Sequence, residues 1–275
     1  MSNDADDAVL YEATSSGVAI LTFNRPDRLN AWGPDIAAGF YAALDRAEQD
    51  PEIRVMVLTG RGRGFCAGAY LGSPDSAAGY GATMATARQT DLADLVGERP
   101  PHFVSTLRKP VIAAINGPCA GIGLTQALMC DVRFAAAGAK FAAVFARRGL
   151  IAEFGISWIL PRLTSWAVAL DLLLSGRTFL AEEAAELGLV KEVVAPEDLM
   201  KRALEYAEDI ARNCSPASMA VIKRQVYGDA TGDVIEATAR AEVLLREAMP
   251  RPDVVEGIVS FLQKRQPRFP SLTSE

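Results

Sequence analysis

The feature that most constrains the fold is a short, almost continuously apolar run, KPVIAAING at residues 109–117, bounded by a proline and a glycine. A run of this kind without polar alternation is typical of a strand covered on both faces, as in an α/β sheet. Two further β-branched runs, VAILTFNRP at 18–26 and IRVMVLTG at 53–60, end in turn residues and predict more strands. The stretch between them, 35–50, carries apolar residues at helical spacing behind Pro34. The first part of the chain therefore predicts strands that alternate with helices.

Later segments carry a different pattern. DVRFAAAGAKFAAV at 131–144 predicts two more strands around a glycine turn. Beyond about residue 156 the periodicity is helical, and a last helix at 253–265 ends in cations that suit the negative end of its dipole. Trp158 and Trp166 fall at helical spacing, and we expect both to lie in the core. The chain thus predicts an α/β core followed by a helical segment.

Charge and cysteine usage narrow the classes of function. The formal net charge of −6 disfavours a duplex nucleic-acid binder, which needs clustered lysine and arginine. The acidic N-terminus does not resemble a signal peptide, and no apolar run approaches the length of a membrane span. The four cysteines lack C-x-x-C spacing, which disfavours a metal site or a disulfide framework. We expect a cytoplasmic protein without a nucleic-acid or membrane partner and without a metal.

Two glycine-rich turns follow predicted strands. GRGRGFCAGAYLG at 60–72 comes directly after one strand, and INGPCAGIGLTQALMCD at 115–131 leads from another strand into an apolar helix. Each turn on its own is more simply a tight strand-to-helix connection, and neither spacing matches a nucleotide-phosphate motif. Glycines nevertheless leave backbone N–H groups accessible. Two such turns on neighbouring strands can aim two donors at one carbonyl oxygen, as in an oxyanion hole.

Four motifs carry a resemblance to a known family. They are FNRPDRLNAW (23–32), GFCAGAYL (64–71), KPVIAAINGPCAGIGLTQALMCDVRFAA (109–136) and SGRTFLAEEAAELGLVKEVV (175–194). In this order they resemble the enoyl-CoA hydratase/isomerase, or crotonase, superfamily. The resemblance implies an α/β fold, a crotonase-like ββα spiral over residues 1–195 that holds the CoA-thioester and oxyanion site, and a helical trimerisation region over 196–275. It also implies an acyl-coenzyme A substrate, no cofactor beyond that coenzyme A, and a homotrimer or dimer of trimers.

By the same resemblance, the two oxyanion N–H donors fall on Ala69 and Ile122. A backbone donor tolerates any side chain that leaves its N–H accessible. The positions of the two hydratase glutamates are occupied by Thr125 and Phe145. Addition of water needs groups that orient the water and exchange its proton, and these two side chains do not supply them. Simple hydration is therefore disfavoured.

Other residues of these motifs are expected to contact the substrate. Arg28 and Lys264 match family positions near the CoA phosphates and adenine, where cations are favoured. The alternative is that both are ordinary solvated charges on the surface. The remaining substrate-binding residues that the resemblance implies are Ala67, Tyr70, Gly121, Thr125 and Phe145. The loop at 72–88, rich in small residues, is a candidate mobile flap over the acyl pocket.

Glu153 is the one family-matched acid that remains. Isomerases of unsaturated acyl-CoAs in this family, and 4-chlorobenzoyl-CoA dehalogenase, place an aspartate at this position. Apolar residues flank Glu153 in the sequence, namely Ile151, Phe154, Ile156 and Trp158. We expect them to desolvate its carboxylate partly and to raise its pKa toward a value useful for proton transfer.

A single carboxylate of this kind predicts isomerisation, because it can take a proton from one carbon and return it to another. Three alternatives stay open. Glu153 is also the kind of acid that stabilises a helix N-terminus. The protein is alternatively a catalytically silent paralogue that binds CoA esters, or a hydrolase or dehalogenase-like enzyme in which Glu153 attacks the substrate. A dehalogenase-like reaction would also require a general base for its hydrolytic step. The one histidine, His102, does not match the position of that base in the dehalogenase.

Overall fold

The computed structural model of the chain describes residues 7–70 and 99–272. Its main sheet has six strands in the order β1-β2-β3-β4-β6-β9, with β1 antiparallel to β2 and the other neighbours parallel. These strands are β1 (Val9–Ala13), β2 (Val18–Phe23), β3 (Val55–Gly60), β4 (Val111–Ile115), β6 (Val132–Ala136) and β9 (Glu192–Val194). A smaller sheet has the order β5-β7-β8. Its strands are β5 (Cys119–Ala120), β7 (Lys140–Ala142) and β8 (Thr178–Leu180). The predicted α/β class is confirmed.

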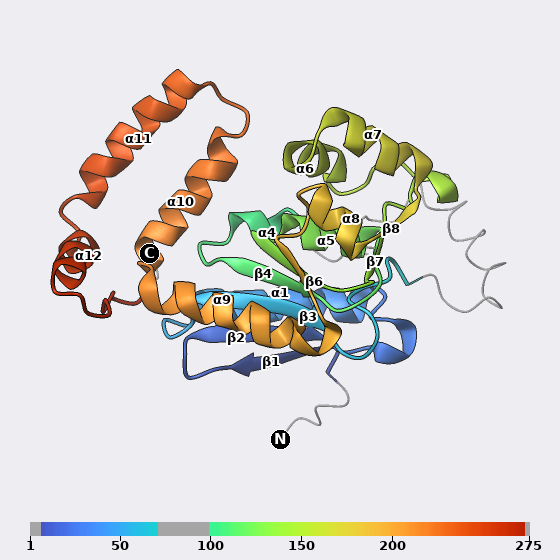
Figure 1. The fold of residues 1–275 in the computed structure, drawn as a ribbon, viewed down its shortest axis with the longest axis horizontal. Helices are drawn as coiled ribbons and strands as arrows, with labels where there is room; N and C mark the ends of the chain where they lie inside the picture. The colour runs from blue at the N-terminus through green and yellow to red at the C-terminus, as the bar shows by residue number, and fades with distance from the viewer. Residues whose placement is uncertain (1–6, 71–98, 273–275) are drawn as a thin grey trace.

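Helices cover the sheet and extend beyond it (Figure 1). The α-helices of the described residues are α1 (Pro34–Gln49), α4 (Phe103–Thr106), α5 (Ile122–Met129), α6 (Ile156–Leu163), α7 (Trp166–Ser175), α8 (Ala181–Glu186), α9 (Leu199–Asn213), α10 (Pro216–Asp229), α11 (Val234–Ala248) and α12 (Pro252–Leu262). Short 3-10 turns are η1 (Pro26–Arg28), η4 (Ala146–Arg148) and η5 (Pro196–Asp198). None of the helices in these residues is both long and apolar enough to cross a membrane.

The central strands are buried on both faces, as their apolar composition predicts. Every residue of β3 and of β4 is buried. Val55 and Val57 of β3 pack with α9 on one face of the sheet, whereas Met56 and Leu58 belong to the larger core with α1 and α5 on the other face. This alternation follows from the two-residue period of a strand. Although α9 lies beyond residue 195, its alanines complete the core against the sheet.

Two expectations about secondary structure need correction. β1 lies in an N-terminal segment that gave no strand signal, and β8 and β9 interrupt a region expected to be helical. β8 and β9 have three residues each, too few for a period of two to stand out from helical periodicity. The two strands predicted around Gly138 are confirmed as β6 and β7, and they belong to different sheets.

The prediction that Trp166 lies in the core is wrong, since its side chain is 76% exposed. Trp166, Leu170 and Leu174 form an exposed apolar stripe along α7. Helical spacing identifies a common face but does not say which element covers it. Trp158 on α6 is partly buried and packs against the core. The loop at 72–88 lies outside the described residues.

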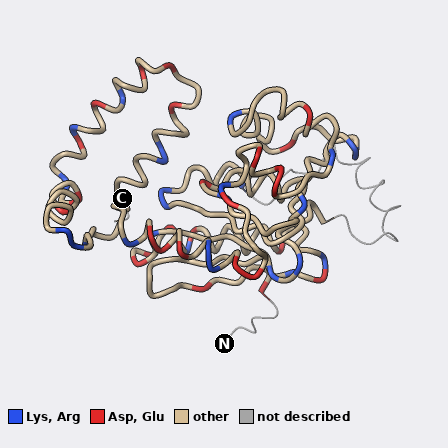
Figure 2. Tube along the Cα trace, viewed as in Figure 1, with Lys and Arg blue, Asp and Glu red and all other residues tan. Residues whose placement is uncertain are grey.

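Helices α10, α11 and α12 form an arm that projects away from the sheet (Figure 1). We call these helices the C-terminal arm. Figure 2 shows acidic and basic residues interspersed along it. Its exposed large apolar side chains are Ile222, Val226, Val234, Ile235, Val243, Leu245, Met249, Val255, Ile258, Phe261 and Leu262. Monomeric proteins rarely leave so much apolar surface in contact with water.

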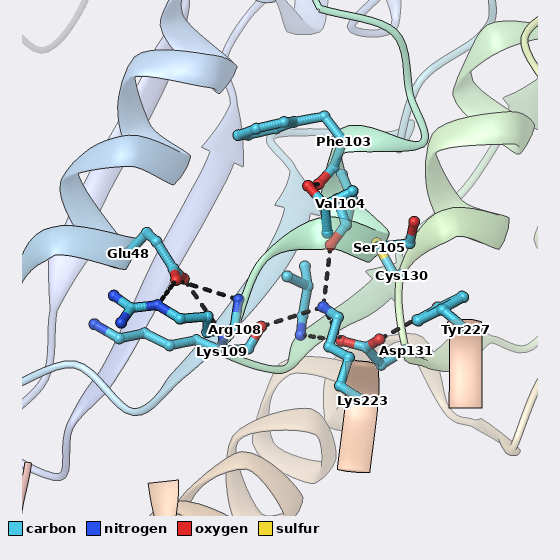
Figure 3. Close-up of polar contacts among 12 residues, drawn as sticks. Glu48, Phe103, Val104, Ser105, Arg108, Lys109, Cys130, Asp131, Lys223 and Tyr227 are labelled. Carbon is cyan, nitrogen blue, oxygen red and sulfur yellow. Dashed lines mark hydrogen bonds and ion pairs between the residues drawn. The ribbon is translucent and has the colours of Figure 1, made fainter. Parts of the chain in front are cut away.

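A buried ion pair anchors the arm to the core. The Nζ of Lys223 on α10 donates to the carboxylate of Asp131 at 2.8 Å and to the carbonyl oxygens of Val104 at 3.0 Å and Lys109 at 3.3 Å (Figure 3). The Tyr227 hydroxyl donates to the second oxygen of Asp131 at 3.3 Å. The Lys223 side chain is only 5% exposed. The arm therefore leaves the core from a polar cluster in which the buried charges are paired.

Candidate active site

The two glycine turns lie side by side, as parallel segments joined by backbone hydrogen bonds. Cys66 and Cys119 form a parallel bridge. The Cys66 N–H donates to the Pro118 carbonyl at 3.0 Å, and the Ala120 N–H donates to the Cys66 carbonyl at 3.0 Å. The first turn thus runs parallel to β5 at this bridge, which brings the residues that follow the two segments close together.

Three glycines allow this close approach. Gly68 and Gly121 have φ angles of +105° and +51°, in the region that side chains rarely adopt, and a β-carbon on Gly121 would lie 3.7 Å from the Cα of Gly68. A β-carbon on Gly123 would lie 2.3 Å from the carbonyl oxygen of Cys66. The first turn of α5 therefore packs directly on the backbone of the other segment.

This arrangement leaves the backbone N–H groups of Ala69 and Ile122 without a backbone acceptor in the described part of the chain. Ala69 bridges Trp32, with the Trp32 N–H donating to Gly68 and the Tyr70 N–H donating to Trp32, each at 2.7 Å. In a parallel ladder the N–H of the residue between such bonds points to the opposite side. Ile122 is the first residue of α5, where an N–H has no partner within the helix. Neither donor has a backbone acceptor among the described residues. Two adjacent, available N–H groups are what an oxyanion hole requires.

The side chains at the two hydratase positions are apolar or internally bonded. Thr125 is fully buried, and its hydroxyl donates to the carbonyl oxygen of Gly121 at 3.3 Å. Phe145 is 3% exposed and precedes η4. Neither provides a carboxylate, and Thr125 is held against the N-terminal turn of its own helix.

Glu153 lies in the loop between η4 and α6. Its side chain is partly buried, and burial raises the pKa of its carboxyl above the ordinary value. Among the described residues, this carboxylate has neither a hydrogen-bond nor an ion-pair partner. Ile151 was expected to help bury Glu153, but it does not do so, because Ile151 is itself 81% exposed. Ile156, in contrast, is fully buried.

The backbone at Glu153 is not that of an ordinary helix-start acid. α6 begins at Ile156, its N-cap is Gly155, and its first turn contains no acid. Phe154 has a φ of +55°, which costs a residue with a side chain about 1–2 kcal/mol. Strain of this kind is concentrated at functional sites. A β-carbon on Gly155 would lie 3.3 Å from the Met129 Cε, so this loop packs on the end of α5. Ile122 begins this helix, which has eight residues, so about 12 Å of helix separates Ile122 from the end on which the loop packs.

Two further predicted substrate residues lie together beside the first turn. The Nη2 of Arg28 pairs with Asp35 at 2.7 Å, and the guanidinium stacks 4.4 Å from the ring centroid of Tyr70, which is 47% exposed. Burial disfavours the Asp35 carboxylate, but hydrogen bonds from Arg28, the Ile36 N–H and Arg25 outweigh it and lower its pKa. Ala67 is joined to the same segment, since its N–H donates to Leu29 at 3.1 Å.

Lys264 is not brought to this group within one chain. Its N–H bonds to Phe261 at 3.1 Å, which fixes it to the end of α12. Figure 1 places α12 in the projecting arm, well away from α5, which lies within the main body.

The sequence does not single out Arg148 as a site residue. Its side chain is exposed, and its Nη1 lies 4.0 Å from the position that a β-carbon on Gly68 would take. Nothing in the local pattern distinguishes Arg148 from its neighbour Arg147.

Comparison with known proteins identifies the family. The family model described as enoyl-CoA hydratase/isomerase matches residues 13–271. The 1,2-epoxyphenylacetyl-CoA isomerase of Escherichia coli is 35% identical over 254 residues, covering 92% of this chain and 95% of that protein. A crystal structure of an enoyl-CoA hydratase from Mycobacterium marinum is 79% identical, with a TM-score of 0.69, and covers 82% of this chain and 100% of that one. A probable enoyl-CoA hydratase/isomerase from Mycobacterium abscessus is 33% identical, with a TM-score of 0.85, over 96% of this chain and 99% of that one. The two glycine turns therefore stand in a crotonase fold, and the chain belongs to the enoyl-CoA hydratase/isomerase family.

Proposed function

We propose that this protein is an acyl-CoA isomerase that moves a double bond through a thioester enolate. The observation that carries the proposal is the pair of available N–H groups, Ala69 and Ile122, on two glycine turns in backbone contact. A thioester oxygen bound between them gains negative charge as the enolate forms, and fixed donors stabilise that charge. The names of the relatives include both hydratases and an isomerase, so acyl-CoA chemistry of this family is the broader conclusion.

Glu153 is proposed as the acid/base group. Its carboxylate takes a proton from the carbon next to the thioester, and the C–H electron pair passes into the enolate. The carboxyl then delivers a proton, which can exchange with solvent, to a carbon farther along the chain. The reaction is balanced, with no water added. The raised pKa of Glu153 supports this role, because a desolvated carboxylate both accepts and returns a proton more readily near neutral pH.

The residues at the two hydratase glutamate positions, Thr125 and Phe145, favour isomerisation over hydration. Thr125 is bonded to its own helix, and Phe145 has no group that exchanges protons. One carboxylate suffices for isomerisation, whereas orienting a water molecule and exchanging its proton calls for more. We therefore rank a hydratase-type reaction second, followed by a silent CoA-ester-binding protein.

We further propose that the protein works as a homotrimer or a dimer of trimers. The apolar residues exposed on the C-terminal arm support this, because association would remove them from water. In such an assembly Lys264 meets the CoA of a neighbouring subunit, since α12 lies far from α5 within one chain (Figure 1).

Proton exchange tests the enzymatic proposal. In deuterium oxide, wild-type protein should exchange protons of a 3-enoyl-CoA and convert it to the 2-enoyl isomer. Glu153→Gln should abolish both while leaving the affinity for a saturated acyl-CoA unchanged. Glu186→Gln on α8, an exposed glutamate, is the matched control and should behave as wild type. Unchanged exchange in Glu153→Gln refutes the assignment. Binding without any exchange in the wild type identifies a silent protein, and formation of a 3-hydroxyacyl-CoA identifies a hydratase.

A further inference from the structure

The two arginines of η4 point to different places. The Nε of Arg147 donates to the Ser175 carbonyl oxygen at 2.7 Å, at the C-terminal end of α7. The Nη1 of Arg148 instead lies 4.0 Å from the β-carbon position of Gly68. That same position is 3.3 Å from the carbonyl oxygen of Ala120. Arg148 thus places a cation where the two glycine turns meet.

This location is one residue from the first proposed donor and two from the second. Gly68 directly precedes Ala69, and Ala120 is followed by Gly121 and Ile122. A thioester oxygen held by both donors therefore brings the acyl group to the neighbourhood of Arg148. The CoA phosphates are not near this point, because the pantetheine arm separates them from the sulfur.

In the part of the chain that the structure describes, the charge of Arg148 is not paired with a carboxylate, in contrast to the charges of Arg28 and Arg177. Arg28 pairs with Asp35, and Arg177 pairs with Asp171 and Glu183. Within residues 7–70 and 99–272, Arg148 has no carboxylate at ion-pair distance, and its side chain is exposed. A guanidinium presents a planar fork of donors that matches a carboxylate bidentately. The chemistry that fits an available guanidinium beside the acyl chain is therefore a carboxylate.

From this position and its available charge we infer that Arg148 determines specificity by binding a carboxylate carried on the acyl group. The preferred substrates are then thioesters of dicarboxylic acids rather than of simple fatty acids. The inference rests on the proposed function for the placement of the thioester, but its first test does not need turnover.

Binding of two saturated thioesters of equal chain length tests the inference directly. Adipyl-CoA carries a terminal carboxylate and hexanoyl-CoA carries a methyl group. By calorimetry the wild type should bind adipyl-CoA more tightly. Arg148→Leu should weaken adipyl-CoA binding by roughly 10–100-fold, the range for a hydrogen-bonded charge, while hexanoyl-CoA changes by less than about 3-fold. Arg148→Lys should recover part of the preference. Arg246→Leu on α11, at a side chain 79% exposed, should leave both affinities unchanged.

Turnover separates this inference from the proposed function. With unsaturated forms of the same two thioesters, Arg148→Leu should lower kcat/KM selectively for the carboxylated one. Selective binding without proton exchange supports Arg148 while refuting the isomerase. Equal losses for both thioesters, or no preference in the wild type, overturn the inference. A thermal melt of Arg148→Leu that matches the wild type verifies that the variant is folded.

Discussion

A β-carbon on Gly123 would lie 2.3 Å from the carbonyl oxygen of Cys66. Gly123 follows Ile122 directly, and Cys66 is three residues before Ala69. The contact between the two turns, and hence the separation of the two proposed donors, is therefore set by backbone atoms with no side chain between them. This makes Gly123 a position at which one methyl group disturbs the site.

Gly123→Ala should push α5 away from the first turn. We expect proton exchange to fall roughly 10²–10³-fold, as when one oxyanion donor is lost, and the unfolding free energy to fall by about 1–3 kcal/mol through overpacking. Exchange kinetics and urea unfolding measure the two effects. Gly228→Ala is the control, since a β-carbon there has no heavy atom within 4 Å and Gly228 lies within α10. A Gly123→Ala enzyme with wild-type exchange contradicts this account.

Glu153 should make stability depend on pH. Burial raises its pKa in the folded state, so the folded chain holds the proton more tightly than the unfolded chain. The resulting stability is present below the unfolded pKa of about 4.3 and is lost as pH rises through the higher folded value. Glu153→Gln has no such loss. Its unfolding free energy should therefore gain on that of the wild type as the pH is raised from about 4 to 7. Urea unfolding across this range, with Glu186→Gln as control, measures the difference, and parallel curves contradict it.

The fold was largely predictable because the burial of its central strands on both faces is visible in the sequence as continuous apolar runs. β3 and β4 are buried on both faces, and a strand with this burial must be apolar throughout. β8 and β9 were missed because three residues are too few to display a period, and their pairing depends on distant β7 and β6. The exposure of Trp166 was missed because spacing along α7 does not reveal what covers it.

The candidate site was predictable to a lesser extent. Glycines between a strand and a helix marked both turns, but not that Gly123 touches Cys66, which depends on how the turns stack. The direction of the Glu153 pKa followed from its apolar company, although Ile151 turned out to be exposed. The position of Arg148 beside Gly68 had no sequence signal, since η4 is a single turn and directs adjacent side chains to different sides.

Lys223→Met should loosen the C-terminal arm. Lys223 neutralises Asp131 and bonds two carbonyl oxygens while its side chain is only 5% exposed (Figure 3). Breaking a buried pair by removing one partner costs about 3–5 kcal/mol, because the other charge stays buried. Urea unfolding should show a loss of this order. Lys201→Met, at an exposed lysine on α9, should change stability by less than about 0.5 kcal/mol. Equal stabilities of the two variants would refute the anchoring role.

Phe261→Glu should convert the proposed trimer into folded monomers. The Phe261 side chain is 81% exposed at the end of α12, among other exposed apolar residues of the arm. In an assembled interface a new carboxylate would lose its hydration without a designed partner, which is costly, whereas on a free monomer it stays in water. Light scattering coupled to size exclusion should report the smaller mass, and circular dichroism should stay unchanged. Arg246→Glu reverses a charge on the same arm at a side chain 79% exposed and should keep the wild-type mass. A wild-type protein that is already monomeric at micromolar concentration refutes the proposed assembly. A trimer that survives Phe261→Glu shows instead that this part of the arm lies outside the interface.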